Sequence, residues 1–327
     1  MVQGALRLFA LGDTAELGAA VAAALGQPLT PHEEREFEDG EHKARPLEGV
    51  DGDDAFVIQS LHGGPARSAN DKLCRLLFFI GALKDAGAAR VTAVCPYLCY
   101  ARKDRRTKAF DPVTTRYVAA MFEAIGANAI VTLEVHNPAA FENAFRHRSV
   151  TLTAAPLLVA EAARLGREPL CVVSPDPGGA KRAELFREAL EAAIGKPVRR
   201  GLADKHRSAG VVTGDLFVGD VAGATALIID DLVSTGGTLV RAARAARQAG
   251  ATRVIALAAH GLFTPGAETA LADPAIDQLI VTDAVPPFRL AGAAVSAKLK
   301  VTPCAPLLAE AISRLHWRRP LTDLLVY

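Results

Sequence analysis

The sequence predicts an α/β protein with mostly parallel sheets flanked by helices. Short apolar and β-branched runs alternate along the chain with longer segments that are rich in Ala and Leu. Parallel strands need crossover connections, which are usually helices, so this alternation is typical of βαβ units. The length of 327 residues and a hydrophobic content of 50% suffice for two domains with substantial cores.

The expected strands are runs of buried apolar residues, and the expected helices have apolar residues at helical spacing. Ala55-Phe-Val-Ile-Gln59 is the first such strand, and the helix after it covers residues 71–86. Later strands are expected at residues 90–96, 129–134, 170–174, 226–229, 253–259 and 278–282. Helices fill most of the gaps, at residues 114–125, 156–165, 180–193 and 238–249.

An internal repeat predicts two related domains. Residues 86–94 match residues 249–257 at six of nine positions, and each copy follows a strand, a loop and a long helix. Chance similarity between two Ala-rich helix ends is the alternative, which the shared order of the flanking elements disfavours. We expect domains at residues 1–150 and 151–302, with a final segment, 303–327, that packs back on the first domain.

Composition excludes several classes of partner. The formal net charge is +1, from 37 basic and 36 acidic residues, whereas nucleic-acid binding usually needs a basic excess. The longest apolar run, residues 76–83, is shorter than half of the ~20 residues of a membrane span. Five cysteines without a CxxC pair indicate reduced thiols, and the amino terminus lacks the features of a signal peptide. We therefore expect a cytoplasmic protein with no nucleic-acid or membrane partner.

The most informative segment is the one that covers residues 226–238. An apolar strand ends in two adjacent carboxylates, Asp230 and Asp231, and a Ser-Thr-Gly-Gly-Thr turn then opens a helix. Glycines and helix-start N–H groups suit a phosphate, while the carboxylates can accept hydrogen bonds from sugar hydroxyls or help to hold Mg²⁺. An ordinary strand–turn–helix with a Thr N-cap is the alternative. The predicted site for a phosphorylated sugar comprises Asp230, Asp231, Ser234, Thr235, Gly236, Gly237 and Thr238.

By itself this loop resembles one that phosphoribosyltransferases share with ribose-phosphate pyrophosphokinases (PRPP synthetases). Five further segments resemble the pyrophosphokinase family. In chain order they are Phe37-Glu-Asp-Gly-Glu41, Pro96-Tyr-Leu-Cys-Tyr-Ala-Arg-Lys-Asp-Arg105, Val135-His136, Ser174-Pro-Asp-Pro-Gly-Gly179 and Asp204-Lys-His-Arg207. Six motifs in order over residues 37–238 make a specific match.

The resemblance implies two duplicated phosphoribosyltransferase-like domains, each a mainly parallel sheet flanked by helices. ATP-side motifs lie in the first domain and the ribose-5-phosphate loop in the second. The implied catalytic residues are Lys205 and Arg207, on a loop that we expect to be flexible, and Arg207 also belongs to the ribose-5-phosphate site. His136 and Asp176 are the implied Mg²⁺ ligands. The implied ATP-binding residues are Phe37, Asp39, Gly40, Glu41, Arg102, Lys103, Asp104 and Arg105.

The implied reaction is transfer of the β,γ-diphosphoryl group of ATP to the 1-hydroxyl of ribose 5-phosphate, which gives PRPP and AMP. In the family, the Phe-x-Asp-Gly-Glu loop completes the adenine site of a neighbouring subunit, so the resemblance also implies a homo-oligomer. The carboxyl end, residues 316–327, lacks the serine-rich tail of the phosphate-activated, ADP-inhibited class. We therefore do not expect that regulation.

Each motif also has a purely structural interpretation. Phe37 could be a hydrophobic staple, His136 a histidine satisfied at a strand end, and Asp176 a helix cap. The basic residues at 102–105 and 205–207 could be solvated charge runs.

Two other functions remain open. Ser234 replaces the family's Asp at the start of the loop, and His206 replaces its middle Arg. Lys103 stands where the family has Gln, and Glu134 stands where the family has Asp. These departures are compatible with a non-catalytic regulatory homologue, and a phosphoribosyltransferase is the other alternative.

Overall fold

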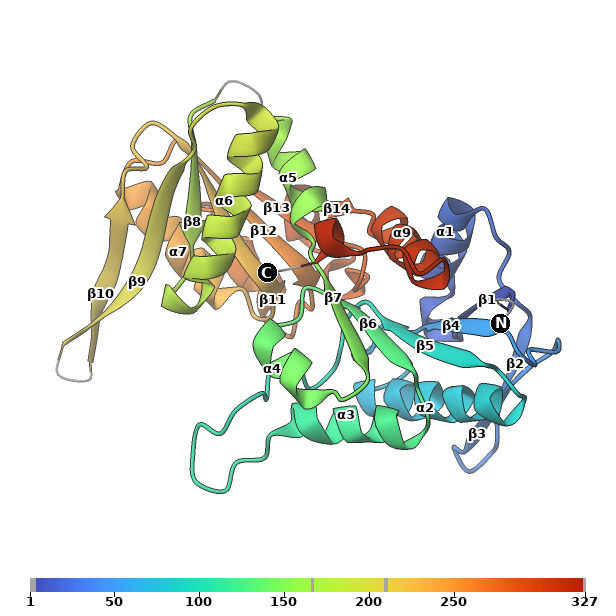
Figure 1. Cartoon of the computed structure of the whole chain (residues 1–327). Coiled ribbons are helices and arrows are strands. Elements are labelled where there is room, and N and C mark those ends of the chain that lie inside the picture. Colours follow the sequence, from blue (N-terminus) through green and yellow to red (C-terminus); the bar gives the residue numbers. More distant parts are fainter. Residues whose placement is uncertain (1–3, 166–167, 209–210, 326–327) are drawn as a thin grey trace. The chain divides into compact units, whose positions relative to one another are not determined.

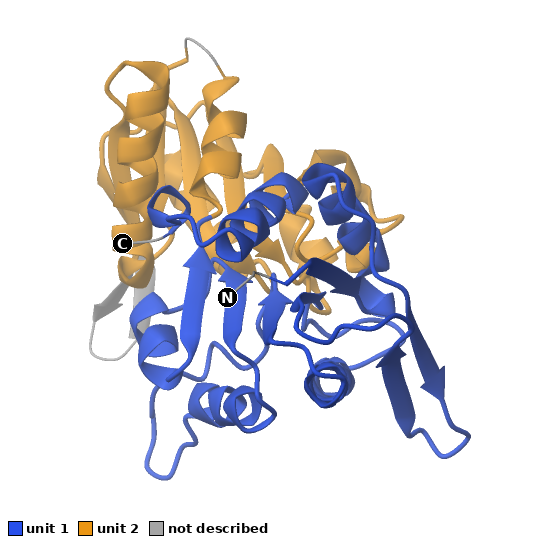
Figure 2. Ribbon diagram, turned by 45° about the vertical axis from the view of Figure 1, so that its right-hand side comes forward, with its two compact units in different colours: residues 1–153, 304–327 blue, residues 154–303 orange. Residues whose placement is uncertain are grey.

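The computed structural model describes residues 4–165, 168–208 and 211–325 (Figure 1). Side chains between 205 and 215 lie outside that description. The chain forms two compact units, coloured separately in Figure 2. Unit 1 comprises residues 1–153 and 304–327, and unit 2 comprises residues 154–303.

Unit 1 is built on a five-stranded parallel sheet of order β1-β4-β5-β6-β7. Its helices α2 (Ala69–Asp85) and α3 (Thr114–Ala124) cover one face, and α1 (Ala15–Leu25) and α9 (Ala305–His316) cover the other (Figure 1). All residues of β4 and β6 are buried, as expected for strands covered on both faces. The short helix α4 is Pro138–Ala144, and the strands are β1 (Leu6–Ala10), β4 (Asp54–Ile58), β5 (Arg90–Cys95), β6 (Ala129–Leu133) and β7 (Arg148–Leu152).

A separate antiparallel ribbon in unit 1 consists of β2 (His32–Glu36) and β3 (His42–Pro46). Its strands are largely polar and carry no continuous apolar pattern, so no local pattern predicts them. The ribbon is stabilised by packing on α2, where Ala44 lies against the core and His42 stacks on Phe78 with ring centroids 5.5 Å apart.

Unit 2 contains a seven-stranded sheet of order β10-β9-β8-β11-β12-β13-β14, in which only the β9–β10 pair is antiparallel among the described pairings. Helices α5 (Ala155–Ala163) and α6 (Ala180–Ile194) lie on one face, and α7 (Gly237–Gln248) lies on the other with the short α8 (Ala267–Leu271) (Figure 1). The strands are β8 (Leu170–Ser174), β9 (Arg199–Ser208), β10 (Val211–Gly219), β11 (Thr225–Val233), β12 (Arg253–Gly261), β13 (Gln278–Thr282) and β14 (Leu299–Thr302).

The predicted α/β class with mainly parallel sheets is confirmed. One local expectation is wrong, because the segment with Lys205 and Arg207 is a strand rather than a loop. In the backbone register, Lys205 faces Asp215 and Arg207 faces Val212 of β10. The polar sequence of this segment resembles a loop, but pairing with β10 supplies the partners that its backbone needs. Among residues 4–165, 168–208 and 211–325, the structure contains no helix that could span a membrane.

Candidate active site

The carboxyl end of β11 brings the acidic pair next to a cation. β11 lies between β8 and β12, so Asp230 and Asp231 lie near the carboxyl end of a central strand, where open α/β sheets bind ligands. The backbone N–H of Asp231 donates to Asp230 Oδ1 at 2.8 Å. Arg182, on α6, places Nη1 3.8 Å from Asp230 Oδ1 and 3.7 Å from Asp231 Oδ1. The pair is therefore a partly neutralised acidic centre.

Burial dominates the electrostatics of this pair. It raises the pKa of Asp230 to about 8, and the hydrogen bond and negative charge of Asp231 act in the same direction. The positive charge of Arg182 opposes them. The side chain of Asp230 is 20% exposed, which leaves it open to a ligand. Such a carboxyl group can accept hydrogen bonds from sugar hydroxyls and hold or release a proton near neutral pH.

The turn after the pair leaves a helix start open to an anion. Gly236 is the N-cap of α7, with φ of 82°, so no side chain of the N-cap covers the first N–H groups of the helix. A Cβ at Gly236 would lie 2.7 Å from Leu271 Cδ2, so this position needs glycine. The predicted alternative of a Thr N-cap is therefore wrong. Ser234 Oγ lies 3.2 Å from Thr264 Oγ1, which fixes its hydroxyl beside the turn.

Asp176 follows β8, next to β11 in the sheet. Its Oδ1 accepts a 3.0 Å hydrogen bond from the N–H of Gly179, so it caps the short helix that leads into α6. Ser174 Oγ donates to the backbone carbonyl oxygen of Asp176 at 2.6 Å. Arg241, on α7, donates from Nη2 to the Pro175 carbonyl at 3.0 Å. The Arg241 bond ties the Asp176 turn to the helix that follows the turn at residues 234–236. The bond from Gly179 shows the capping role that was the structural alternative.

In unit 1, the first ATP motif forms the tip of the β2–β3 ribbon. The N–H of Phe37 donates to the carbonyl of Glu41 at 2.8 Å, and the N–H of Glu41 donates to Asp39 Oδ1 at 3.1 Å. Gly40 has φ of 90°, which suits glycine in this tight turn. Phe37 is 36% exposed, and the Arg35 guanidinium lies 5.2 Å from its ring centroid. Because this turn joins two strands, the hydrophobic-staple interpretation of Phe37 is wrong.

The second ATP motif and the predicted histidine meet where β5 and β6 end. Asp104 Oδ2 accepts a 2.6 Å hydrogen bond from Nδ2 of Asn137, the N-cap of α4 and the neighbour of His136. Lys103 is paired with Asp111 at 2.6 Å. Arg102, Arg105 and His136 are exposed.

Not all predicted residues are brought together. Within the described residues, the ribbon tip makes no hydrogen bond or ion pair with segment 102–105. His136 belongs to unit 1, whereas Asp176 and the sugar-phosphate loop belong to unit 2. The side chains of Lys205 and Arg207 lie outside the described residues.

Comparisons with known proteins decide the family. Residues 6–126 match the N-terminal domain of ribose phosphate pyrophosphokinase, and residues 215–325 match the phosphoribosyl synthetase-associated domain. A ribose-phosphate pyrophosphokinase from Caldanaerobacter subterraneus subsp. tengcongensis is 38% identical over 95% of each chain. Ribose-phosphate pyrophosphokinase 1 from Streptococcus pyogenes serotype M3 is 35% identical over 98% of this chain and 97% of its own. The chain belongs to the ribose-phosphate pyrophosphokinase family.

A solved structure agrees with this family. The phosphoribosylpyrophosphate synthetase from Mycobacterium smegmatis superposes with a TM-score of 0.85 at 33% identity, over 96% of this chain and 99% of that one. The predicted pair of phosphoribosyltransferase-like domains is thus confirmed, as is the family that the six motifs indicated.

Three side chains near the sugar-phosphate loop of this pyrophosphokinase-family chain were not predicted. Arg182 approaches the acidic pair, Arg241 binds the Asp176 turn, and Thr264 lies against Ser234. Arg182 and Arg241 are basic residues on amphipathic helices, and Thr264 follows a strand, so no local pattern distinguishes them. Only the pairing of β8, β11 and β12 places them at one edge of the sheet.

The donor set fits a magnesium ion that takes most of its ligands from phosphates and water. Mg²⁺ prefers oxygen ligands and usually takes only one or two carboxylates from the protein. Asp176, Asp230 and Asp231 offer such oxygens in unit 2, and His136 offers a nitrogen in unit 1. In the described part of the chain, no three His, Cys, Asp or Glu side chains form a ready-made metal centre.

Proposed function

We propose that the chain is a ribose-phosphate diphosphokinase. It transfers the β,γ-diphosphoryl group of ATP to the 1-hydroxyl oxygen of ribose 5-phosphate. The observation that carries this proposal is the buried Asp230–Asp231 pair followed directly by the glycine-capped start of α7, in a chain similar to pyrophosphokinases along almost its whole length. The pair suits ribose hydroxyls and the helix start suits the 5-phosphate.

The reaction forms one bond and breaks one. The 1-hydroxyl oxygen attacks the β-phosphorus, the bond from that phosphorus to the oxygen bridging it to the α-phosphorus breaks, and AMP leaves with that oxygen. The hydroxyl proton is released. Because no covalent enzyme intermediate is needed, catalysis depends on positioning and charge stabilisation.

The residues divide these tasks. Asp230 orients the ribose hydroxyls with Asp231 behind it, and residues 234–238 hold the 5-phosphate. Lys205 and Arg207 neutralise charge on the β- and γ-phosphates, and Arg207 also contacts the sugar phosphate.

The nucleotide side is held by unit 1. Arg102, Lys103, Asp104 and Arg105 bind ATP, and the ribbon tip with Phe37, Asp39, Gly40 and Glu41 lies at the nucleoside end of a site in a neighbouring subunit. The chain is accordingly a homo-oligomer. The absence of disulfides among its five cysteines in the described part of the chain and the use of ATP support a cytoplasmic location.

His136 and Asp176 would hold Mg²⁺ on ATP, where the ion neutralises phosphate charge. The exposed imidazole of His136 and the carboxylate of Asp176 are accessible to a nucleotide phosphate in their own units. Asp176 keeps its capping bond to Gly179 through Oδ1.

The test measures AMP release from ATP, Mg²⁺ and ribose 5-phosphate. We expect AMP release to depend on the sugar and to fall by about 10²–10³-fold in Lys205→Ala, the cost of removing one transition-state contact. ATP binding by Lys205→Ala, measured by calorimetry, stays nearly intact. Equal losses of ATP binding and turnover would contradict the role of Lys205. ATP binding without AMP formation by the native protein would favour the regulatory homologue, and PRPP consumption with a nucleobase would favour a phosphoribosyltransferase.

A further inference from the structure

The β2–β3 ribbon has one face against α2 and one face in solvent. Glu36 lies opposite His42 in the last register position before the tip. Both residues belong to the inward face, because side chains alternate between the two faces along each strand. On the inward face, His42 stacks on Phe78 of α2. On the outward face, Arg45 Nε donates to Glu33 Oε2 at 2.7 Å.

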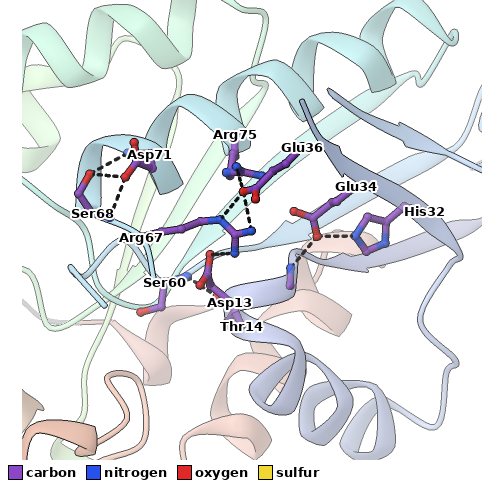
Figure 3. Close-up of polar contacts among 11 residues, drawn as sticks. Asp13, Thr14, His32, Glu34, Glu36, Ser60, Arg67, Ser68, Asp71 and Arg75 are labelled. Carbon is purple, nitrogen blue, oxygen red and sulfur yellow. Dashed lines mark hydrogen bonds and ion pairs between the residues drawn. The ribbon is translucent and has the colours of Figure 1, made fainter. Parts of the chain in front are cut away.

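Glu36 connects the end of the ribbon to two other elements. Its Oε1 accepts from Arg67 Nη2 at 2.8 Å and Nε at 3.2 Å, and also from Nη2 of Arg75 on α2 (Figure 3). Arg67 Nη1 reaches Asp13 Oδ2 at 3.1 Å. One carboxylate oxygen thus joins the residue directly before the tip to α2 and to the loop after β4.

The burial of Arg75 makes this contact costly to lose. Its side chain is only 8% exposed, and its Nε and Nη1 are buried without a hydrogen-bond partner in the described part of the chain. Removing the carboxylate while the ribbon stays packed on α2 would leave this buried guanidinium without its ion-pair partner Glu36, which is costly. The Glu36 side chain is 52% exposed, so water can solvate its carboxylate when the ion pair is broken, and the free-energy cost for Glu36 is small.

We propose that Arg75, through Glu36, is a positioning residue for ATP. By holding the last pair of the ribbon, it fixes the direction in which the tip presents Phe37, Asp39 and Glu41. This inference rests on the proposed function, in which the tip lies at the nucleoside end of ATP. That end is remote from the β-phosphorus, so the contact contributes to ATP binding and not to the chemical step.

The experiment compares Glu36→Gln and Arg75→Gln with Arg45→Gln, which breaks the ion pair on the outward face of the same ribbon. We expect KM for ATP to rise about tenfold in the first two variants, with kcat and KM for ribose 5-phosphate within twofold of the native values. Arg45→Gln leaves all three unchanged. The double variant Glu36→Gln/Arg75→Gln should resemble Glu36→Gln, because Glu36→Gln already removes the ion pair with Arg75.

Amide hydrogen exchange supplies a readout that does not depend on activity. Amides 37–41 should exchange faster in Glu36→Gln and Arg75→Gln, while those of α2 keep their protection. Unchanged tip exchange and unchanged KM for ATP in Glu36→Gln would overturn the inference, as would a loss confined to kcat. If Arg75→Gln does not fold, Glu36→Gln alone decides. If the native protein releases no AMP, the proposed function fails, and tip exchange in Glu36→Gln still decides whether the contact of Glu36 with Arg75 fixes the ribbon tip.

Discussion

At the scale of residues, Asp230 combines features that suit sugar recognition with a cost in stability. Its carboxyl is held in a buried position beside a second carboxylate, with Arg182 nearly 4 Å away. A group placed in this way binds a proton more tightly in the folded than in the unfolded chain. The acidic pair therefore lowers folding stability at neutral pH.

The stability of the protein should consequently fall as the pH rises from about 4 to about 8. In this window the unfolded chain has lost the Asp230 proton while the folded chain still holds it, so unfolding is favoured by up to ~1.4 kcal/mol per pH unit. Asp230→Asn removes this dependence. Urea unfolding at pH 5 and pH 8 measures it, with the exposed Asp220→Asn as the matched control. An unchanged pH dependence in Asp230→Asn would show that the group is not buried as described.

At the scale of elements, α2 and α7 begin in different ways, although both follow corresponding strands of the internal repeat. The α2 start is closed by its own side chains, since Ser68 Oγ accepts from the Asp71 N–H and Asp71 Oδ2 accepts from the Ser68 N–H (Figure 3). The α7 start has glycine as its N-cap. Of these two helix starts, that of α7 lacks such a capping box, so its first N–H groups stay open to an anion.

Gly236→Ala tests the start of α7. The added Cβ would clash with Leu271 at a φ that disfavours alanine, so we expect a destabilisation of about 1–3 kcal/mol. Movement of the turn should raise KM for ribose 5-phosphate at least about tenfold. Gly195→Ala is the matched control, because Gly195 has φ of 65° at the end of α6 with open space around it. We expect both variants to have a lower melting temperature and only Gly236→Ala to have a raised KM. Equal effects on KM would contradict the role of the turn.

At the scale of the whole molecule, the carboxyl-terminal segment packs against the sheet of unit 1. His316 Nδ1 lies 2.9 Å from Asp54 Oδ2, and Arg90 bonds both Asp54 and the Leu315 carbonyl. Leu325 forms a bridge with Leu152 at the edge of the sheet. The end of the chain therefore contributes its polar groups to packing within unit 1.

Inorganic phosphate should accordingly activate the enzyme by less than about twofold beyond the effect of matched ionic strength, since the carboxyl-terminal segment uses its polar groups for packing within unit 1. Initial rates at fixed ATP and ribose 5-phosphate, with phosphate or sulfate increased at constant ionic strength, provide the measurement. Strong activation by phosphate would show that another part of the chain supplies a regulatory site.

Local sequence patterns suffice to predict the features that depend on neighbouring residues. Buried strands such as β8 and β13, the helices between them, and the acidic pair followed by glycines are all visible as local patterns. The resemblance of six motifs then indicated the family. Tertiary structure alone decided the rest, because it depends on residues far apart in the chain. The β2–β3 ribbon is polar and exists through its contact with α2, and Arg75 meets Glu36 from 39 residues away. Arg182 reaches Asp230 in the same way, and burial by the folded sheet, not the identity of the residue, is what raises the pKa of that carboxyl group.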